Sequence, residues 1–349
     1  MVASGIVPII SFSGFLEGDD TQKRETALEL LNACKDVGFL MLRDFESVMP
    51  KGKVTEAFAK TKQFFDLPFE VKDRLEWECP ESNRGYVRQG RERVTQATSA
   101  EEIAKLRAQA PDYKETMEIG KDYKEGAFDS PFENRWPDAE QPDFKPFMND
   151  FFATCHRLHL EIMRALALAM DLGEHFFDDK VNQQAHNLRL LNYPSIEREK
   201  IEGGGNRAGS HTDYGTVTLL FQDMVGGLEV QDKEGNFVPA KPVPDTVVVN
   251  IGDLLQRWSN DVLSSTKHRV VLPHDLAESM TPRRNSIAFF SNPNLHQLIS
   301  CLPNTGGAKY EPVETEAYLV KRLGETFPSV PLTAPRADDL ATSRKRQNI

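Results

Sequence analysis

The order of apolar and polar positions divides the chain into a helical first half and a strand-rich second half. Apolar residues recur at helical spacing in four segments, and Gly38 gives the first of them a natural end. Short strands are predicted at 6–11 and 38–45, where β-forming residues are grouped. The predicted helices span residues 25–37, 51–65, 144–170 and 314–327.

Residues 81–125 are polar, and no regular period runs through them apart from a predicted helix at 99–109. We expect most of this segment to be irregular. A long loop of this kind in a globular chain is typical of a lid or a binding loop.

Beyond residue 185, short runs of β-forming residues alternate with Gly, Pro, Asn and Asp, which favours a β-sandwich or barrel over a doubly wound sheet. We therefore expect an α+β fold in one domain. Its parts are a helical region at 1–180, a β core at 185–300, a C-terminal helix at 310–333 and a polar tail at 334–349. The runs are 186–193, 215–223, 226–232, 236–243, 245–259, 267–273 and 285–292.

Charge and composition exclude several classes of function. The formal net charge of the 349 residues is −11, so a general nucleic-acid binder is not expected. The four cysteines are far apart and form neither a disulfide framework nor a zinc motif. No secretory signal is visible and no apolar run has the ~18 residues of a membrane span, so a cytoplasmic protein without a membrane partner is expected.

Three residues have the spacing of a metal site. His211 and Asp213 are two apart in a strand-like run, where alternate side chains point the same way, and His268 opens another predicted strand. Two imidazoles and one carboxylate on one side of an ion leave open positions, which suits iron(II) and oxygen better than a closed zinc site.

A chance spacing remains an alternative, because eight histidines give an H-x-D by chance about once in every two such chains. His159 and Glu161 have a similar spacing but lie in a predicted helix, where residues two apart point about 200° apart. Strand context therefore separates the two pairs.

The run 285–292 carries a second constellation, which begins one residue earlier. Arg284, Ser286, Ala288 and Phe290 fall on one face by alternation. An arginine on an inner face is unfavourable unless it meets an anion, and its fork beside a hydroxyl suits a carboxylate. The alternative is a pair with an internal Asp or Glu.

Taken together, the motifs HTD, HRV and RNS resemble the isopenicillin-N-synthase-like family of iron(II)/2-oxoglutarate-dependent dioxygenases. The segments IVPIIS, ACKDVGFLMLRDF and FFDLPFEVKDR resemble its N-terminal region. The segments RGYVRQGRE, DYKETMEIGKD and NRWPD are similar to its microbial, especially fungal, branch.

The resemblance implies a double-stranded β-helix (jelly-roll, cupin-like) core flanked by helices. It implies iron held by His211, Asp213 and His268, and the C5 carboxylate of 2-oxoglutarate held by Arg284 and Ser286. Tyr193 matches a tyrosine that assists this binding, and Arg189 shares its strand face. Two departures are Leu191, where plant members carry Asn, and an insertion at 273–282 that lengthens a loop.

The implied activity is oxidation of a small molecule by dioxygen, through hydroxylation, desaturation or ring chemistry, in fungal secondary metabolism. 2-Oxoglutarate is converted to succinate and carbon dioxide, and ascorbate is a candidate reductant. The sequence leaves the substrate and the oligomeric state open. The candidate substrate contacts are Tyr214, Arg91, Arg93, Thr95 and Phe290.

Three other functions stay open at this point. An iron oxidase that works without 2-oxoglutarate has matching Arg and Ser residues that bind its substrate. An ethylene-forming-type enzyme shares the GYVxxG and HTDYG patterns, although Glu92 is offset by one residue from the expected position. A cupin-like binding protein is the non-enzymatic alternative.

Overall fold

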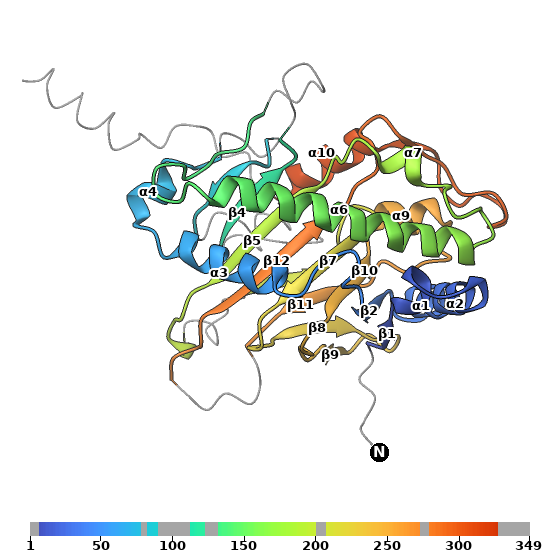
Figure 1. Cartoon of the computed structure of the whole chain (residues 1–349), viewed down its shortest axis with the longest axis horizontal. Coiled ribbons are helices and arrows are strands. Elements are labelled where there is room, and N and C mark those ends of the chain that lie inside the picture. The colour runs from blue at the N-terminus through green and yellow to red at the C-terminus, as the bar shows by residue number, and fades with distance from the viewer. Residues whose placement is uncertain are drawn as a thin grey trace, which may run out of the picture.

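The computed structural model describes residues 7–77, 82–89, 112–122, 132–199, 207–272 and 279–326 (Figure 1). The predicted helix at 99–109 and the tail at 334–349 lie outside these residues. The helices are α1 (Ser13–Leu16), α2 (Asp20–Asp36), α3 (Lys53–Phe65), α4 (Phe69–Asp73), α6 (Phe144–Ala169), α7 (Asp178–Val181), α9 (Asp253–Trp258) and α10 (Thr315–Thr326).

Two sheets form the centre of the molecule, and a two-stranded ribbon of β13 (Leu298–Ile299) and β14 (Val313–Glu314) lies apart from them. The minor sheet has the order β6 (Ala208–His211), β11 (His268–Val270), β8 (Leu228–Gln231), β9 (Phe237–Pro239). The major sheet has the order β1 (Ile9–Ser11), β2 (Phe39–Arg43), β10 (Val247–Ile251), β7 (Val217–Gln222), β12 (Arg284–Phe290), β5 (Asn187–Tyr193), β4 (Glu115–Gly120), β3 (Gly85–Val87).

The connections between the sheets make this a double-stranded β-helix. From β5 onward the chain alternates between layers, because β5, β7, β10 and β12 belong to the major sheet and β6, β8, β9 and β11 to the minor one. The pairings within this core are antiparallel. The predicted α+β jelly-roll is thus confirmed.

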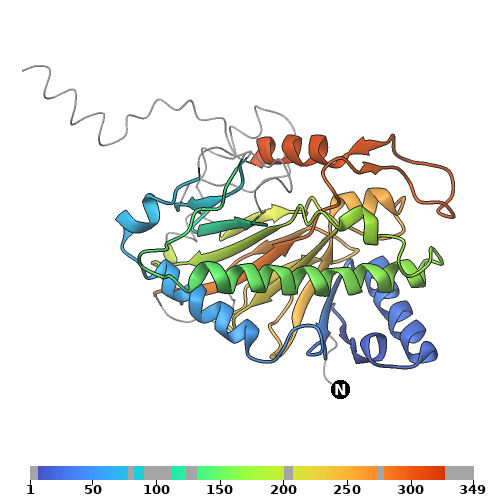
Figure 2. The same ribbon diagram turned by 45° about the horizontal axis from the view of Figure 1, so that its top comes forward.

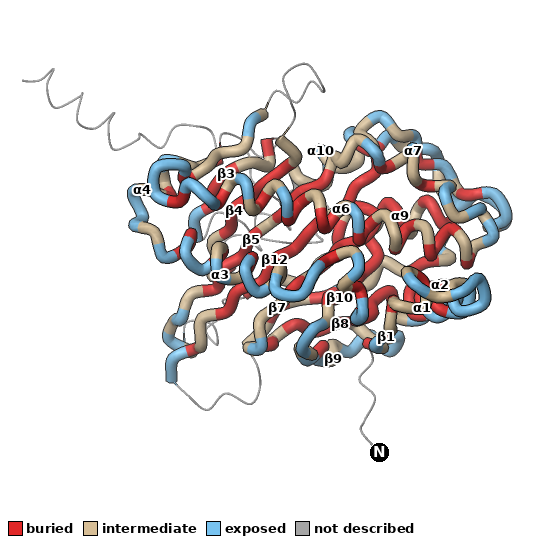
Figure 3. The backbone as a smooth tube through the Cα atoms, in the orientation of Figure 1, coloured by how far each residue is buried: buried red, intermediate tan, exposed pale blue. Residues whose placement is uncertain are grey.

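Helix α6 crosses the outer face of the major sheet (Figures 1 and 2). Its apolar positions recur every three or four residues, and Phe151, Leu158 and Ile162 are fully buried against the strands and α2. Burial of this face is the main source of stability for a helix of this kind. Figure 3 shows the buried residues concentrated in the major sheet and beneath α6.

A second, smaller core fills the space between the two sheets, and the site described below opens into it. Its members include Phe39, Met41, Leu191, Tyr193 and Val230. The polar side chains that line the site interrupt this inner core. The inner face of the major sheet is therefore less apolar than its outer face.

The structure differs from the sequence prediction in several places, and one is the C-terminal helix expected at 310–333, where Val313 and Glu314 instead pair with β13. Residues 81–125 were expected to be irregular apart from one helix, but β3 and β4 extend the major sheet beside β5. The alternation of β4, with polar side chains inward and apolar ones outward, is short and lies within a polar segment, so it did not stand out. Helix α2 begins at Asp20 rather than 25, because Asp19 and Gln22 form a capping box.

Another difference concerns the run 245–259, which was expected to be β-rich throughout. It is divided into β10 and α9 at Gly252. A Cβ at Gly252 would lie 2.4 Å from the carbonyl oxygen of Gly215, so only glycine allows this close approach.

Within the described residues, no helix combines the length and the apolar character needed to cross a bilayer.

Candidate metal centre and adjoining anion pocket

His211, Asp213 and His268 come together at one end of the space between the sheets. His211 is the last residue of β6, and it pairs directly with His268, the first residue of β11. One oxygen of Asp213, Oδ1, lies 3.8 Å from His211 Nε2 and 3.6 Å from His268 Nε2. The three side chains therefore surround one point, at which a single ion would touch all of them.

The position of Asp213 differs from the prediction. It does not share a strand with His211 but lies in the turn after β6, so strand alternation is not what brings the two together. The backbone N–H of Asp253, at the start of α9, donates to the carbonyl oxygen of Asp213 at 2.7 Å. The turn and its contact with α9 therefore place the carboxylate.

Hydrogen bonds fix the tautomers of both histidines. His211 Nδ1 lies 2.8 Å from the carbonyl oxygen of Gly209, and His268 Nδ1 lies 3.2 Å from that of Thr266. A carbonyl only accepts, so each Nδ1 carries a proton, and in the neutral ring each Nε2 then presents a lone pair to the centre. This is the arrangement typical of metal-binding histidines.

The carboxylate of Asp213 is held in the same way. Its Oδ2 accepts hydrogen bonds from Thr218 Oγ1 at 2.6 Å and Asn250 Nδ2 at 2.7 Å, which leaves Oδ1 for an ion. Burial raises the pKa of Asp213, but the two histidines and these hydrogen bonds outweigh it, so its pKa is below the usual value. Burial and the nearby His268 lower the pKa of His211 to about 3.

A cation at this point would thus be bound by two neutral imidazoles and one anionic oxygen, all on one side of it. Such a donor set fits a six-coordinate iron(II) ion with open positions for other ligands. The buried carboxylate has no cationic side chain among these neighbours, so an ion of charge +2 would also compensate its charge.

An anion pocket adjoins this centre. Arg284 is 1% exposed, its Nη1 donates to Ser286 Oγ at 3.1 Å, and its Cζ lies 4.9 Å from the centre of the Tyr193 ring. Its Nε and Nη2 are buried without a hydrogen-bond partner among the described residues. A buried guanidinium with two unused donors is matched by a carboxylate ligand.

The predicted strand faces are confirmed. The side chains that line the cavity next to the metal centre include, from β12, Arg284, Ser286, Ala288 and Phe290, and from β5, Arg189 and Tyr193. Within the described part of the chain no carboxylate forms an ion pair with Arg284, so the alternative of an internal acid is not what the structure shows there.

Arg189 lines the cavity, as its position on the face of Tyr193 predicted, and its guanidinium is paired with a buried carboxylate. Its Nε lies 2.7 Å from Glu118 Oε1, and Glu118 is completely buried. Arg189 also stacks on Phe290, with its Cζ 5.4 Å from the ring centre. The sequence analysis missed Glu118 and the buried cavity residue Lys114, since both belong to the segment expected to be irregular.

The predicted substrate residues separate into three groups. Phe290 lines the cavity. Tyr214 is not among the lining residues, and its ring lies under Arg322, with the guanidinium carbon 4.5 Å from the ring centre. Arg91, Arg93 and Thr95 lie outside the described residues.

Comparison with known proteins places this site in a family. Residues 185–293 match the family described as the 2OG-Fe(II) oxygenase superfamily, and residues 7–139 match the N-terminal region described as that of the non-haem dioxygenase in morphine synthesis. Among curated relatives, the 2-oxoglutarate-Fe(II) type oxidoreductase ppzD of Metarhizium majus is 36% identical, over 85% of this chain and 87% of that protein.

Two further relatives cover nearly the whole chain. The proline hydroxylase buaE of Petromyces alliaceus is 34% identical, over 91% of this chain and 98% of that protein. A full-length Neurospora crassa protein, whose crystal structure holds α-KG (2-oxoglutarate) and thymine, is 45% identical. Its structure covers 93% of this chain and 98% of its own, with a TM-score of 0.82.

These similarities agree with the resemblance inferred from the sequence motifs, and they extend over both halves of the chain. The chain therefore belongs to the 2OG-Fe(II) oxygenase superfamily and is an Fe(II)- and 2-oxoglutarate-dependent dioxygenase.

Proposed function

We propose that His211, Asp213 and His268 hold the Fe(II) ion, and that Arg284 and Ser286 hold the C5 carboxylate of 2-oxoglutarate. The observation that carries the second assignment is the pair of unused buried donors on Arg284. Tyr193 supports the guanidinium through its ring. Fe(II) and 2-oxoglutarate, when bound, supply the chemistry that activates dioxygen with release of succinate and carbon dioxide.

In this proposal the protein's own residues hold the ion and orient the side chains that bind it. Gly209 and Thr266 fix which nitrogen of each histidine faces the ion, and Thr218 and Asn250 orient Asp213. The proposed unit is a single oxygenase domain, because β1 to β4 of the first half continue the sheet that carries the site.

We propose further that the substrate is a small, flat, polar ring of the pyrimidine nucleobase class. Phe290 offers an aromatic side chain to the cavity, and Arg189, which is paired with Glu118, places a guanidinium beside it. Leu191 and Ala288 add apolar surface to the same cavity, and Lys114 is a further polar residue there. The related Neurospora crassa structure, which holds thymine, supports this class.

The test is a comparison of substrates under one assay. The anaerobically Fe(II)-loaded protein is given 2-oxoglutarate and dioxygen with thymine, uracil, free proline or a proline-containing peptide. Succinate and the oxidised product are quantified by mass spectrometry. We expect succinate formation to rise, and product to match it, with a pyrimidine.

The other outcomes are equally informative. Coupled turnover with proline or the peptide alone would overturn the substrate class and leave the oxygenase assignment standing. Succinate formation that is unchanged in a His268→Ala variant would overturn the metal assignment. Ethylene in the headspace would point to the ethylene-forming alternative.

A further inference from the structure

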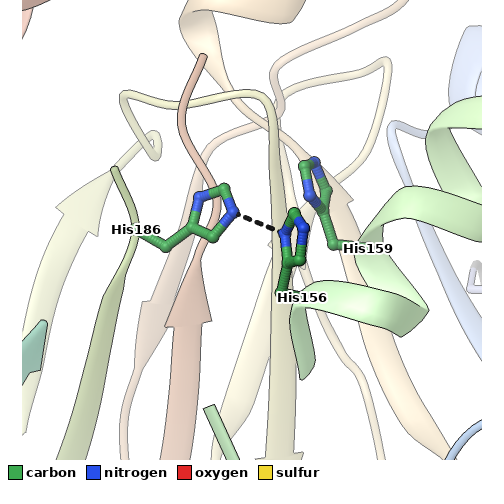
Figure 4. Close-up of side chains that lie close together, drawn as sticks. All are labelled: His156, His159 and His186. Carbon is green, nitrogen blue, oxygen red and sulfur yellow. Dashed lines mark hydrogen bonds between the residues drawn. The ribbon is translucent and has the colours of Figure 1, made fainter. Parts of the chain in front are cut away.

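A second group of three histidines lies behind the metal centre, on the other face of the major sheet. His156 and His159 project from α6 toward His186, which immediately precedes β5 (Figure 4). His159 and His186 are buried and His156 is partly exposed. Burial lowers the pKa of all three, in the case of His156 to about 4, so the three imidazoles are neutral at pH 7.

The spacing of these imidazoles would admit a metal ion, but their protons argue against one. The backbone N–H of Asn292 donates to His186 Nδ1 at 3.0 Å, so the proton of the neutral ring is on Nε2. His186 Nε2 then donates to His156 Nδ1, also at 3.0 Å. An ion bound by these two nitrogens would have to displace the proton that they share.

The third histidine is oriented toward a different partner. Thr216 Oγ1 donates to the carbonyl oxygen of Ser291 at 3.0 Å, so it can only accept from His159 Nε2, 3.2 Å away. His159 Nδ1 is buried and has no partner among the described residues. His211 and His268 behave in the opposite way, because their Nδ1–H groups bind carbonyls and their Nε2 lone pairs converge.

Thr216 connects this cluster to the turn that carries Asp213. The backbone N–H of Thr216 donates to Ser291, and the N–H of Gly252 donates to the carbonyl oxygen of Thr216, both at 2.8 Å. A Cβ at Gly215 would lie 2.1 Å from the carbonyl oxygen of Ser291, so this stretch is pressed between the end of β12 and the start of α9. His159 adds a contact from the helix layer.

We propose that His159 is a positioning residue for the metal centre, which acts through Thr216 on the turn that presents Asp213. This inference rests on the proposal that Asp213 is an iron ligand. A phenylalanine would occupy a similar volume without a buried, unpaired nitrogen. The cost of that nitrogen is explained if the Nε2–H bond keeps Thr216, and through it Asp213, in place.

The experiment measures Fe(II) affinity of the full-length protein anaerobically with saturating 2-oxoglutarate, beside the melting temperature of the metal-free form. His159→Phe and Thr216→Val remove the hydrogen bond, and His159→Gln and Thr216→Ser retain a donor or an acceptor. We expect the Kd for Fe(II) to rise about 10-fold in the first two variants, the lower end for a supporting contact, and to recover in the other two.

His156→Phe is the matched control, because this histidine is on the same helix and in the same cluster but bonds to His186 rather than to Thr216. It should leave the Kd for Fe(II) at the wild-type value. A similar loss of affinity in His156→Phe would overturn the proposal, since packing of the cluster would then be the cause. Lower melting temperatures with an unchanged Kd in His159→Phe and Thr216→Val would also overturn it.

Two controls test the proposed metal site itself and the possibility that the histidine cluster binds a metal ion. Asp213→Ala should abolish Fe(II) binding, and if it does not, the proposed metal site itself fails. Titration of the metal-free protein with Zn²⁺ should give one equivalent bound in the wild type and in His159→Phe. A second equivalent that is present only in the wild type would identify the cluster as a metal site and overturn the positioning role.

Discussion

Arg284 offers a direct test of the co-substrate pocket, because the same substitution should have opposite effects on ligand binding and on the metal-free fold. In Arg284→Met an unbranched apolar chain replaces the buried guanidinium. The variant loses one hydrogen bond to Ser286 and the contact with the Tyr193 ring. It also loses the two unused donors, Nε and Nη2.

The size of the effect on binding follows from those donors. A hydrogen bond to a charged group contributes about 1.5–3 kcal/mol, so two of them to the C5 carboxylate give about 3–6 kcal/mol. That range corresponds to a Kd for 2-oxoglutarate weakened by roughly 10²- to 10⁴-fold.

Stability should change in the other direction or not at all. Replacing a buried charge that has little compensation is often neutral or stabilising, by about 1–4 kcal/mol. The lost ring contact reduces this gain by about 0.5–2 kcal/mol. The metal-free variant should therefore melt at or above the wild-type temperature.

The assay is thermal unfolding of the Fe(II)-loaded protein under anaerobic conditions with increasing 2-oxoglutarate. Wild-type protein at 100 times Kd should gain about 2.7 kcal/mol, whereas the variant should gain almost nothing at the same concentration. Arg283→Met is the control, since the neighbouring Arg283 bonds to Asn192 and Asp66 instead of lining the cavity. A Kd for Arg284→Met within about tenfold of wild type, or 1.4 kcal/mol, would refute the reasoning.

Three other predictions concern the walls of the cavity and the histidine cluster. Phe290→Ala should raise the KM for the substrate and leave the Kd for 2-oxoglutarate unchanged, and equal effects on both in steady-state and binding assays would contradict the separate subsites. Arg189→Met removes the ion pair with the fully buried Glu118, which keeps its hydrogen bond from Thr116, and should lower the free energy of unfolding in urea by up to about 3–5 kcal/mol. Adding Glu118→Leu to this variant should restore most of the lost free energy of unfolding. A double variant as unstable as Arg189→Met would show that loss of the ion pair is not the cause. The pKa of His156 falls from 6.5 to about 4 on folding. Between these two pH values His156 is therefore protonated in the unfolded chain but neutral in the folded one. The contribution of His156 to the free energy of unfolding is therefore fully present above pH 6.5. It decreases toward pH 4, at about 1.4 kcal/mol per pH unit. Chemical denaturation across this range should give a shallower slope for His156→Phe, and an identical slope would count against it.

The helices, the β-rich second half and the site faces were predictable because their signals are local, whereas the jelly-roll itself was implied by the family resemblance. Arg284 to Phe290 alternate along one strand, and the apolar stripe of α6 repeats at helical spacing. Strand β4 was missed because its inward residues Thr116 and Glu118 are polar and its outward residues Met117 and Ile119 are apolar. Within a polar segment this short alternation carries little weight.

Contacts between distant parts of the chain were the other source of error. The sequence indicated that His211 and Asp213 face one ion, but it assigned this to a strand, whereas the turn after β6 and α9 are responsible. The partnership of Arg189 with Glu118 depends on the pairing of β4 with β5. His159 was considered only for its spacing to Glu161, and nothing local to it indicates that His186 lies beside it.

Strand β12 spans the cavity, and its inward positions define distances along it. Its inward positions pass from Arg284 at one end to Phe290 at the other, six residues and about 20 Å apart. A shift of one residue in register would turn all four inward side chains away together. Single substitutions at the Phe290 end leave the Arg284 end intact, and a relative of this protein could therefore acquire a new substrate while it keeps the same oxidant.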